Sequence, residues 1–371
     1  MKLALRELRR RPGRFVTAAV ILTLVAVLVM FLGGLLDGLI RGSTGALRAQ
    51  NADVVVYSES ARTTFVRSRI DAETRAAVEA VPGVARTGGV GIVQLGARVP
   101  GNDPRDLAAT ALFGYELAPS GIPEAPGPGT VYADDVLRAD GVEVGMEILL
   151  GPARSPVTVI GFVTDVSYSG QGSLWAEPGT WREVMAANRP DVRLPDDSFQ
   201  ALVVQAADGV DVDRLAAEID DALEGRVESL SVSDAIDAIP GVRQQRSTFN
   251  QIIGVTVVIA AVVVALFFAL LTVERLALYG VLKALGARSR TLFAGLVAQA
   301  VVVTAAASIV AGGAAYGIDA LIPAGSIPLD ISARRVILSA ALLLVAAVIG
   351  CGFSLRRVLR VDPAAAIGTS S

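Results

Sequence analysis

The sequence predicts an α-helical membrane protein with four transmembrane helices and a large extracytoplasmic α+β domain inserted between helices 1 and 2. Hydrophobic residues make up 53% of the 371 residues and charged residues only 19%, so the chain is too apolar to be wholly soluble. Four runs carry no Asp, Glu, Lys or Arg, and each is long enough to cross the ~30 Å hydrocarbon core of a bilayer. Between the first two runs lies a long segment with the apolar stretches and turn residues of a folded domain.

The first uncharged run, residues 15–36, directly follows a basic amphipathic segment, residues 1–14. A secretory signal peptide also has a basic start and an apolar middle. The run here is longer than the ~7–15-residue core of a signal peptide, and no clear small-x-small cleavage site follows it. We therefore predict that 15–36 is a retained transmembrane helix, and that the runs 252–273, 292–318 and 336–355 are the other three.

The distribution of basic residues predicts the orientation. If the chain crosses four times, the segment 1–14, the connection 274–290 and the tail 356–371 all lie on one side of the membrane, and all three are basic. By the positive-inside rule this side is the cytoplasm. We expect a multi-pass protein of the bacterial cytoplasmic (inner) membrane with both termini in the cytoplasm.

The long insert, residues 37–246, then lies on the extracytoplasmic side. It contains 31 acidic and 18 basic residues, so its net charge is strongly negative. The short connection 319–335 is predicted to be an extracytoplasmic loop, although its Arg334 and Arg335 run against the positive-inside rule.

The insert has the pattern of an α+β domain. Short, mostly β-branched segments predict strands at 53–57, 90–95, 148–150, 157–163 and 201–205. Helices are predicted at 71–81 and 211–223, each opened by an Asp that can cap free backbone amides. The stretch 118–130 holds four prolines among glycines, and we interpret it as a loop or as the boundary between two lobes.

The composition excludes several kinds of catalytic site. The chain has no histidine and one cysteine, Cys351, so histidine-based catalysis, Cys/His zinc sites and intrachain disulfides are ruled out. The P-loop pattern G-x-x-x-x-G-K-[ST] does not occur in the sequence. We expect no intrinsic catalytic site, no bound metal and no cofactor on this chain, and the sequence identifies no substrate-binding residues.

Two carboxylate pairs and two tryptophans remain as isolated candidates. Asp134-Asp135 and Asp196-Asp197 are interpreted as solvated turns, because adjacent residues on a strand point to opposite faces and form no chelate by themselves. Trp175 and Trp181 are interpreted as buried packing residues or membrane-proximal anchors rather than as a binding surface.

The four uncharged runs also limit the transport mechanism. Secondary transporters place ionisable residues within the bilayer to carry protons or ions, and none of these runs contains one. The main polar residues of the third run are Gln299, Thr304, Ser308 and Tyr316, which argues against a hydrophilic route through the bundle.

The connection 274–290 mixes charged and apolar residues between the second and third spans. It reads Glu274-Arg275-Leu276-Ala277-Leu278-Tyr279-Gly280-Val281-Leu282-Lys283-Ala284-Leu285-Gly286-Ala287-Arg288-Ser289-Arg290. Gly286 can end a helix within it, and Ser289 can cap the start of the third span. We call this segment the elbow.

The elbow resembles the cytoplasmic elbow of the FtsX/MacB-type permeases of ABC transporters, also called type VII or mechanotransmission systems. The whole layout is similar to that family and to its DevC-like four-span subunits: a basic start, one span, a large external domain, three spans and a basic tail. Inside the insert, Gly145-Met146-Glu147-Ile148 followed by Val157-Thr158-Val159-Ile160-Gly161 also looks like the paired-strand pattern of the MacB-like periplasmic core.

The resemblance implies a permease subunit that forms a homodimer, or a heterodimer with a paralogous permease, and binds a separate ABC ATPase in the cytoplasm. ATP and Mg would belong to that ATPase. The implied ATPase-coupling residues are Glu274, Arg275, Tyr279, Gly280, Leu282, Lys283, Ala284, Leu285, Gly286, Ala287 and Arg288. The chain departs from the family at Leu278, where elbows usually carry a second acidic residue.

Three functions remain open at this point. The first is a permease that drives export or extrusion of a substrate. The second is a non-transporting mechanotransmission permease that activates an extracytoplasmic cell-wall hydrolase, and the third is a membrane-anchored sensor or adhesion protein without an ATPase. In that third case the elbow is an ordinary interfacial amphipathic turn. An extracytoplasmic adaptor or hydrolase and membrane lipid are the further expected partners, and no nucleic acid is expected.

Overall fold

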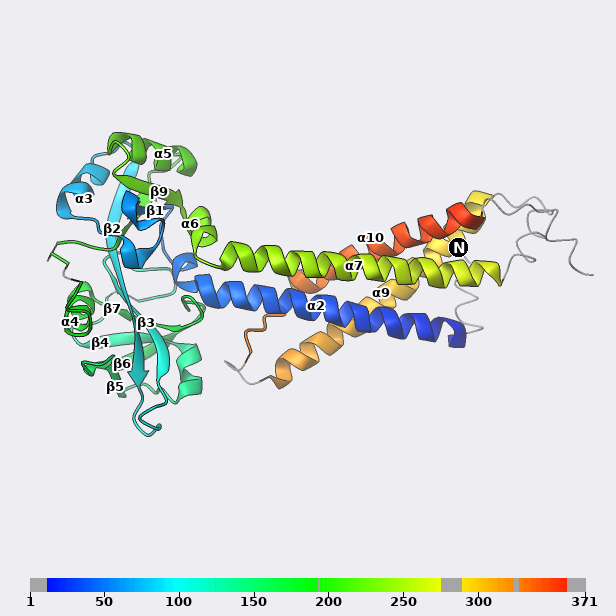
Figure 1. Ribbon diagram of the computed structural model, residues 1–371, viewed down its shortest axis with the longest axis horizontal. Coiled ribbons are helices and arrows are strands. Elements are labelled where there is room, and N and C mark those ends of the chain that lie inside the picture. Colours follow the sequence, from blue (N-terminus) through cyan, green and yellow to red (C-terminus); the bar gives the residue numbers. More distant parts are fainter. Residues whose placement is uncertain are drawn as a thin grey trace, which may run out of the picture. The chain divides into compact units, whose positions relative to one another are not determined.

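The computed structural model describes residues 12–123, 125–192, 194–195, 197–274, 289–322 and 327–358 (Figure 1). The described residues divide into two compact units. One is helical and contains the chain up to Gly38, from Arg246 to residue 322, and from Leu329 onward; the other, which we call the insert domain, is mainly Leu39–Gln245. A membrane protein with four spanning helices and an inserted domain between the first two is therefore confirmed.

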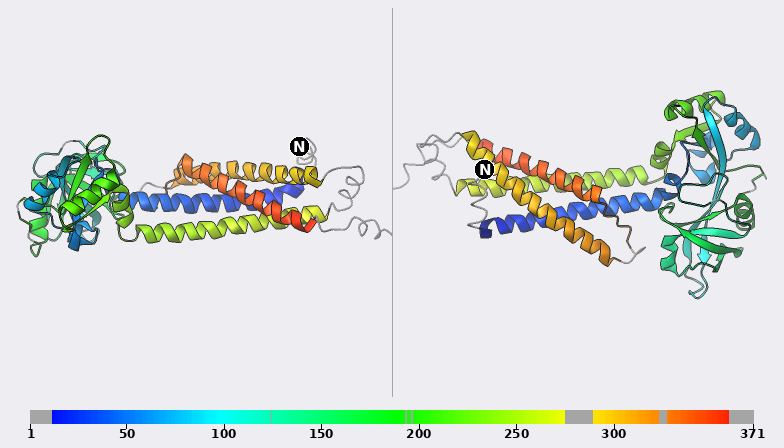
Figure 2. Two further views of the ribbon diagram at one scale, coloured as in Figure 1. Left: turned by 90° about the horizontal axis from the view of Figure 1, so that it is seen from above. Right: turned by 180° about the vertical axis from the view of Figure 1, so that it is seen from behind.

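Four long helices build the helical unit. They are α2 (Pro12–Arg48), α7 (Val242–Val273), α9 (Ser289–Leu321) and α10 (Ala333–Val358). Each of the four uncharged runs lies within one of these helices, and all four are long and apolar enough to cross a membrane. The helices α9 and α10 pack against each other and cross in the two views of Figure 2.

Small residues let these helices approach closely. Ala26, Ala260, Ala300, Ala311 and Ala347 are all fully or almost fully buried in the interior of the helical unit. At Gly350 of α10, a β-carbon would collide with the backbone carbonyl of Ala261 in α7. Association of helices in lipid depends on such close packing, because lipid tails are as apolar as leucine side chains.

The insert domain is built on a nine-stranded mixed sheet. The strands are β1 (Val54–Ser58), β2 (Val84–Arg98), β3 (Ala108–Tyr115), β4 (Thr130–Asp134), β5 (Glu147–Leu150), β6 (Ser155–Val163), β7 (Gly172–Ala176), β8 (Ala201–Ala206) and β9 (Val227–Ser231). Their order is β3-β7-β4-β6-β5-β2-β8-β1-β9, and β2 also pairs with β3. The β3–β7 and β4–β6 pairs are parallel and the others antiparallel.

The long strand β2 divides this sheet into two parts. Because β2 pairs with both β5 and β3, the strands β3, β7, β4, β6, β5 and β2 form a closed circuit. The strands β8, β1 and β9 continue the sheet from β2, outside this circuit. The loop 118–129 connects β3 to β4 within the closed circuit. A loop is confirmed there, but a boundary between two lobes is wrong, because the strands on both sides of the loop belong to the same circuit.

Short helices cover the sheet. They are α3 (Ala72–Glu79), α4 (Pro178–Asn188), α5 (Val212–Ala222) and α6 (Val232–Ala238), together with the 3-10 turns η1 (Glu59–Ala61), η2 (Phe65–Arg67) and η3 (Asp135–Asp140). The two predicted helices are confirmed with their caps: Asp71 accepts a hydrogen bond from Thr74 N and Asp211 from Arg214 N. All five predicted strands are present.

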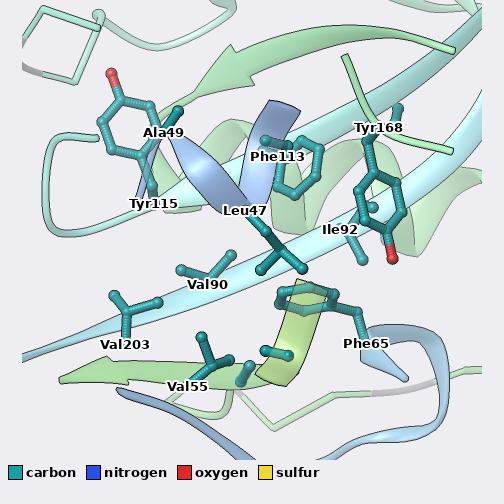
Figure 3. Packing of buried hydrophobic residues seen from close by; sticks show 14 of the residues in the cluster. Leu47, Ala49, Val55, Phe65, Val90, Ile92, Phe113, Tyr115, Tyr168 and Val203 are labelled. Carbon is teal, nitrogen blue, oxygen red and sulfur yellow. The ribbon is translucent and has the colours of Figure 1, made fainter. Parts of the chain in front are cut away.

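Three hydrophobic clusters form the core of the insert domain. One lies under α3 and α5 against β1 and β8, and a second fills the space between the closed circuit and α4. The third is central and aromatic, and it includes Leu47 and Ala49 from the last turn of α2 and the segment after it, beside Phe65, Phe113 and Tyr168 (Figure 3). The end of α2 is therefore part of the folded core of this domain.

Candidate functional site

The predicted ATPase-coupling elbow begins where α7 ends. Glu274 follows the last residue of the helix, its backbone N donates to Leu270 O at 3.0 Å, and its side chain is exposed. The next described residue is Ser289, the first of α9. The other predicted coupling residues lie outside the described residues: Arg275, Tyr279, Gly280, Leu282, Lys283, Ala284, Leu285, Gly286, Ala287 and Arg288. Their roles stay predictions.

A charged pair joins two membrane helices in the helical unit. Arg335 of α10 binds Asp37 of α2 through two guanidinium nitrogens. Nε donates to Oδ2 at 2.7 Å, and Nη2 donates to Oδ1. Both side chains are largely buried, with 22% of Arg335 and 30% of Asp37 exposed. A bidentate, partly desolvated pair of this kind is stronger than an ordinary surface ion pair. It gives Arg335, which ran against the positive-inside rule, a local partner.

Two glycines of α2 make room for this pair. A β-carbon at Gly33 would lie 2.6 Å from Cδ of Arg335, and one at Gly34 would lie 2.9 Å from a side-chain carbon of Ile331. The backbone N of Asp330 also donates to Gly34 O at 3.0 Å. The segment that leads into α10 is thus fixed to α2 by backbone contact as well as by charge.

The polar groups of α9 lie mostly inside the helical unit. Gln299, Thr304 and Ser308 are buried, whereas Tyr316 is 42% exposed. The hydroxyls of Thr304 and Ser308 have no hydrogen-bond partner among the described residues.

The interpretation of Asp134 as a solvated turn residue is wrong. Asp134 is fully buried at the end of β4, where its carboxylate accepts hydrogen bonds from Ser167 Oγ at 2.5 Å and from Val136 N at 3.4 Å. Burial raises the pKa of this carboxyl to about 6, and the neighbouring charge of Asp135 acts in the same direction. The sequence did not reveal this burial, because it arises from the pairing of β4 with β6 and β7.

The other adjacent carboxylates differ from Asp134. Asp135 is half-buried and Asp197 is exposed, while Asp196 lies outside the described residues. Within the described ranges, no three His, Cys, Asp or Glu side chains gather closely enough to hold a metal ion.

The raised pKa of Asp134 predicts a pH dependence of stability. The folded domain holds this proton more tightly than the unfolded chain, whose Asp pKa is near 3.8, so wild-type stability relative to Asp134→Asn should rise as the pH falls through 6. Between about pH 7.5 and pH 4, the difference in the free energy of unfolding between wild type and Asp134→Asn should change by about 2 kcal/mol. This corresponds to roughly 4–8 °C in the unfolding midpoint. The chain has two tryptophans, Trp175 and Trp181, both in the insert domain, so their fluorescence in the detergent-solubilised full chain reports this unfolding. A difference between the two proteins that stays constant with pH would contradict the prediction.

Both tryptophans are packing residues. Each is fully buried, Trp175 stacked on Phe113 with ring centroids 4.6 Å apart and Trp181 on Phe199 at 6.1 Å. The interpretation as buried packing is confirmed.

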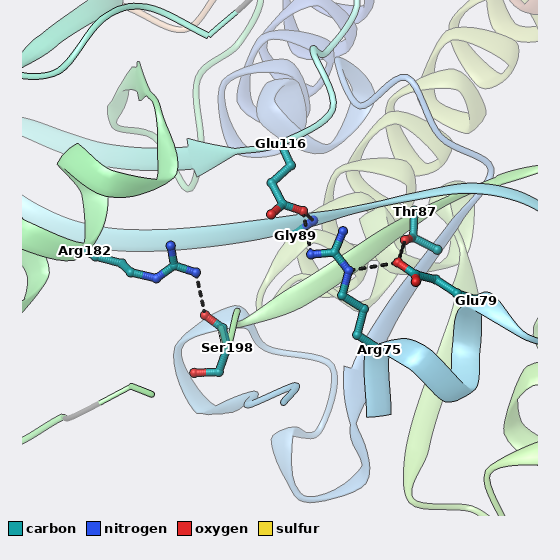
Figure 4. A network of polar contacts seen from close by, with 7 residues as sticks. All are labelled: Arg75, Glu79, Thr87, Gly89, Glu116, Arg182 and Ser198. Carbon is teal, nitrogen blue, oxygen red and sulfur yellow. Dashed lines mark hydrogen bonds and ion pairs between the residues drawn. The ribbon is translucent and has the colours of Figure 1, made fainter. Parts of the chain in front are cut away.

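The glycine-rich stretch 88–91 lies in the interior of β2 and has a structural role. Gly89 N donates to Oε2 of Glu116 at 2.8 Å, and Arg75 bridges Glu116 and Glu79 (Figure 4). Thr87 donates to the same Glu79 carboxylate.

Sequence reasoning missed the Asp37–Arg335 pair. A signal for it was present, because Asp37 directly follows the first uncharged run and Arg335 directly precedes the fourth, on the same expected side of the membrane. Opposite charges at the same depth in two spans predict a pair when the two helices are neighbours.

Known proteins match this chain over its whole length. Residues 250–363 match the model of the FtsX-like permease C-terminal family. The chain is 21% identical to the putative hemin transport system permease protein HrtB of Staphylococcus haemolyticus, over 99% of both chains. It is 26% identical to an uncharacterized ABC transporter permease of Mycobacterium bovis, over 98% of both chains.

Among solved structures, the periplasmic region of MacB from Actinobacillus actinomycetemcomitans aligns with 52% of this chain and 94% of that chain, at 11% identity and a TM-score of 0.35. Residues 250–363 thus match the FtsX-like permease C-terminal family, and over its whole length the chain is similar to ABC transporter permeases.

Proposed function

We propose that this chain is the permease subunit of an ABC exporter that couples ATP hydrolysis on a separate ATPase to motion of the insert domain. In this proposal the elbow binds the ATPase in the cytoplasm, and the insert domain is extracytoplasmic. Two such permease chains, identical or paralogous, form the transporter, and ATP and Mg are bound by the ATPase. The observation that carries the proposal is the family match over 250–363, because this range contains the whole elbow and most of the three helices around it.

The helix boundaries support this assignment. The elbow lies between the end of α7 at Val273 and the start of α9 at Ser289, so a force on the elbow acts directly on two membrane helices. Helix α7 has 32 residues and spans roughly 48 Å at 1.5 Å per residue. Its other end, at Val242, belongs to the insert domain, so the chain runs from the elbow to that domain through α7.

Hemin is the first substrate to test. Three of the relatives are named as putative hemin transport permeases. This chain contains no histidine, so any protein ligand to hemin iron would have to come from Met, Tyr or Cys side chains. ATP-dependent accumulation of hemin inside inverted vesicles that contain the permease and its ATPase is the direct assay.

The elbow predicts a loss of ATPase binding on mutation. Gly286→Val, Lys283→Ala and Tyr279→Ala should each weaken association with the co-expressed ATPase by about tenfold or more. In the proposal, Tyr279 and Lys283 contact the ATPase and Gly286 ends the helix that binds it. Membrane insertion of the permease should not change. Co-purification from detergent-solubilised membranes, with ATP hydrolysis of the eluted complex, measures the effect. Lys2→Ala is the matched control, since Lys2 is the other lysine of the chain. An undiminished, ATP-hydrolysing complex from the elbow variants would rule out this role.

A further inference from the structure

A loop of the insert domain makes backbone hydrogen bonds with α2. The loop, residues 164–171, connects β6 to β7. Ala46 N donates to Ser167 O, and Gly170 N donates to Gly42 O, both at 3.0 Å. In a regular α-helix the N–H of residue 46 donates to the C=O of residue 42. The loop therefore bonds the two groups that a regular helix pairs with each other.

Close approach of the loop depends on Gly45. A β-carbon at this position would lie 2.6 Å from Asp165 O, 2.8 Å from Ser167 N and 2.9 Å from Ser167 O. The loop also donates from Ser169 N to Ser43 O at 3.0 Å. It holds Asp165 and Ser169 at positive φ, a conformation that non-glycine residues keep only where their surroundings impose it. The loop thus fits this helix only with glycine at position 45.

The same loop is anchored to the sheet. Ser167 Oγ donates to the buried carboxylate of Asp134, the last residue of β4. The ring of Tyr168 is buried with its centroid 5.5 Å from that of Phe113 and 6.1 Å from that of Phe65. A continuous set of contacts therefore runs from the backbone of α2 through the loop to β3 and β4.

The attachment of α7 to the insert domain is different. This helix starts at Val242, directly after Pro240-Gly241, and Gly241 has a φ of +90°. At this turn Val242 N donates to Ile239 O and Gln245 N donates to Gly241 O, and both are local backbone hydrogen bonds. The chain thus leaves the domain through a turn at α7, whereas at α2 the helix backbone itself is bonded into the domain.

We propose that the last turns of α2 and this loop form the joint through which displacement of α2 enters the sheet, with Gly45 and Ser167 as positioning residues. We call residues 42–46, 164–171 and Asp134 the α2 clasp. The inference rests on the proposed function, in which ATP-driven movement reaches α2. Because a helix is stiff along its axis and the clasp bonds are made by its backbone, axial movement of α2 displaces the loop and, through Asp134, the end of β4.

Hydrogen–deuterium exchange on the purified full chain with its ATPase tests the clasp. Nucleotide-free and ATP–vanadate-trapped complexes are compared for the wild type, Gly45→Ala, Ser167→Ala and Gly13→Ala. In the wild type, trapping should change exchange in α2 and in β4. In Gly45→Ala and Ser167→Ala the response of β4 should fall by about tenfold while the response of α2 and ATP hydrolysis persist.

The variants separate coupling from folding. A β-carbon at Gly13, near the other end of α2, meets nothing within 4 Å, so Gly13→Ala adds the same methyl group to this helix outside the clasp and should behave as wild type. Ser167→Ala adds no atoms, and tryptophan fluorescence verifies that each variant is folded. If trapping changes the exchange of β4 in both Gly45→Ala and Ser167→Ala as much as in the wild type, the proposed role of the clasp is wrong, whereas the proposed function is unaffected. No nucleotide response in α2 of the wild type would overturn the proposed function and the clasp together.

Discussion

Replacing Gly91 with alanine is expected to cost the insert domain about 3 kcal/mol or more, because the added methyl group overlaps a buried ring. A β-carbon at Gly91 would collide with the indole of Trp181, and one at Gly114, its partner on β3, would lie 2.6 Å from Cβ of the same residue. Trp181 cannot move away, since it is fully buried and stacked on Phe199. Urea unfolding of the full chain in detergent, followed by tryptophan fluorescence, measures the loss.

Two further variants test the cause of this loss. Gly127→Ala is the matched control, because a β-carbon there meets nothing within 4 Å, and it should unfold as wild type does. Trp181→Leu vacates the space above Gly91, so Gly91→Ala should cost at least about 1 kcal/mol less in that background than in the wild type. Trp175 remains as the fluorescent probe. Equal costs in the two backgrounds would show that the indole is not the obstacle.

The sequence was most informative where local chemistry decides the structure. The predicted strands that overlap β1 and β8 are rich in valine, and Asp71 and Asp211 cap their helices as expected. The strands β3 and β7 were not predicted, because Ala108–Tyr115 and Gly172–Ala176 are rich in small residues and carry little β-branched signal. Their position inside a closed circuit of strands, and not their composition, makes them strands.

The features that the sequence did not predict depend on side chains that are distant in the sequence. The sequence alone did not explain Gly89 and Gly91, because their role depends on the rings of Phe199 and Trp181, which the topology brings against β2. The burial of Asp134 depends in the same way on Ser167. For the elbow, the resemblance and the family match agree on the segment, whereas the roles of its individual residues require the ATPase to be present.

Loss of the Asp37–Arg335 pair is expected to weaken the membrane bundle by about 2 kcal/mol, since either residue without the other leaves a largely buried charge unpaired. Asp37→Arg should be the most harmful single change, because it places two guanidinium groups in contact. The double variant Asp37→Arg/Arg335→Asp restores opposite charges and should recover most of the loss. Cys351, the only cysteine of the chain, is buried in the bundle, so the rate at which a maleimide labels it reports opening of these helices.

The insert domain supplies a matched ion pair for comparison. Arg41 and Asp165 are 44% and 56% exposed, with the closest N–O distance 3.5 Å, and exposed pairs contribute about 0–1 kcal/mol. Asp165→Asn should therefore leave the labelling of Cys351 unchanged, while Asp37→Asn accelerates it by about tenfold or more. If the double charge reversal labels as fast as Asp37→Arg alone, the two residues act separately, and the pair does not fasten α2 to α10. If it recovers, the attraction between these two side chains holds the first and the fourth membrane helix together.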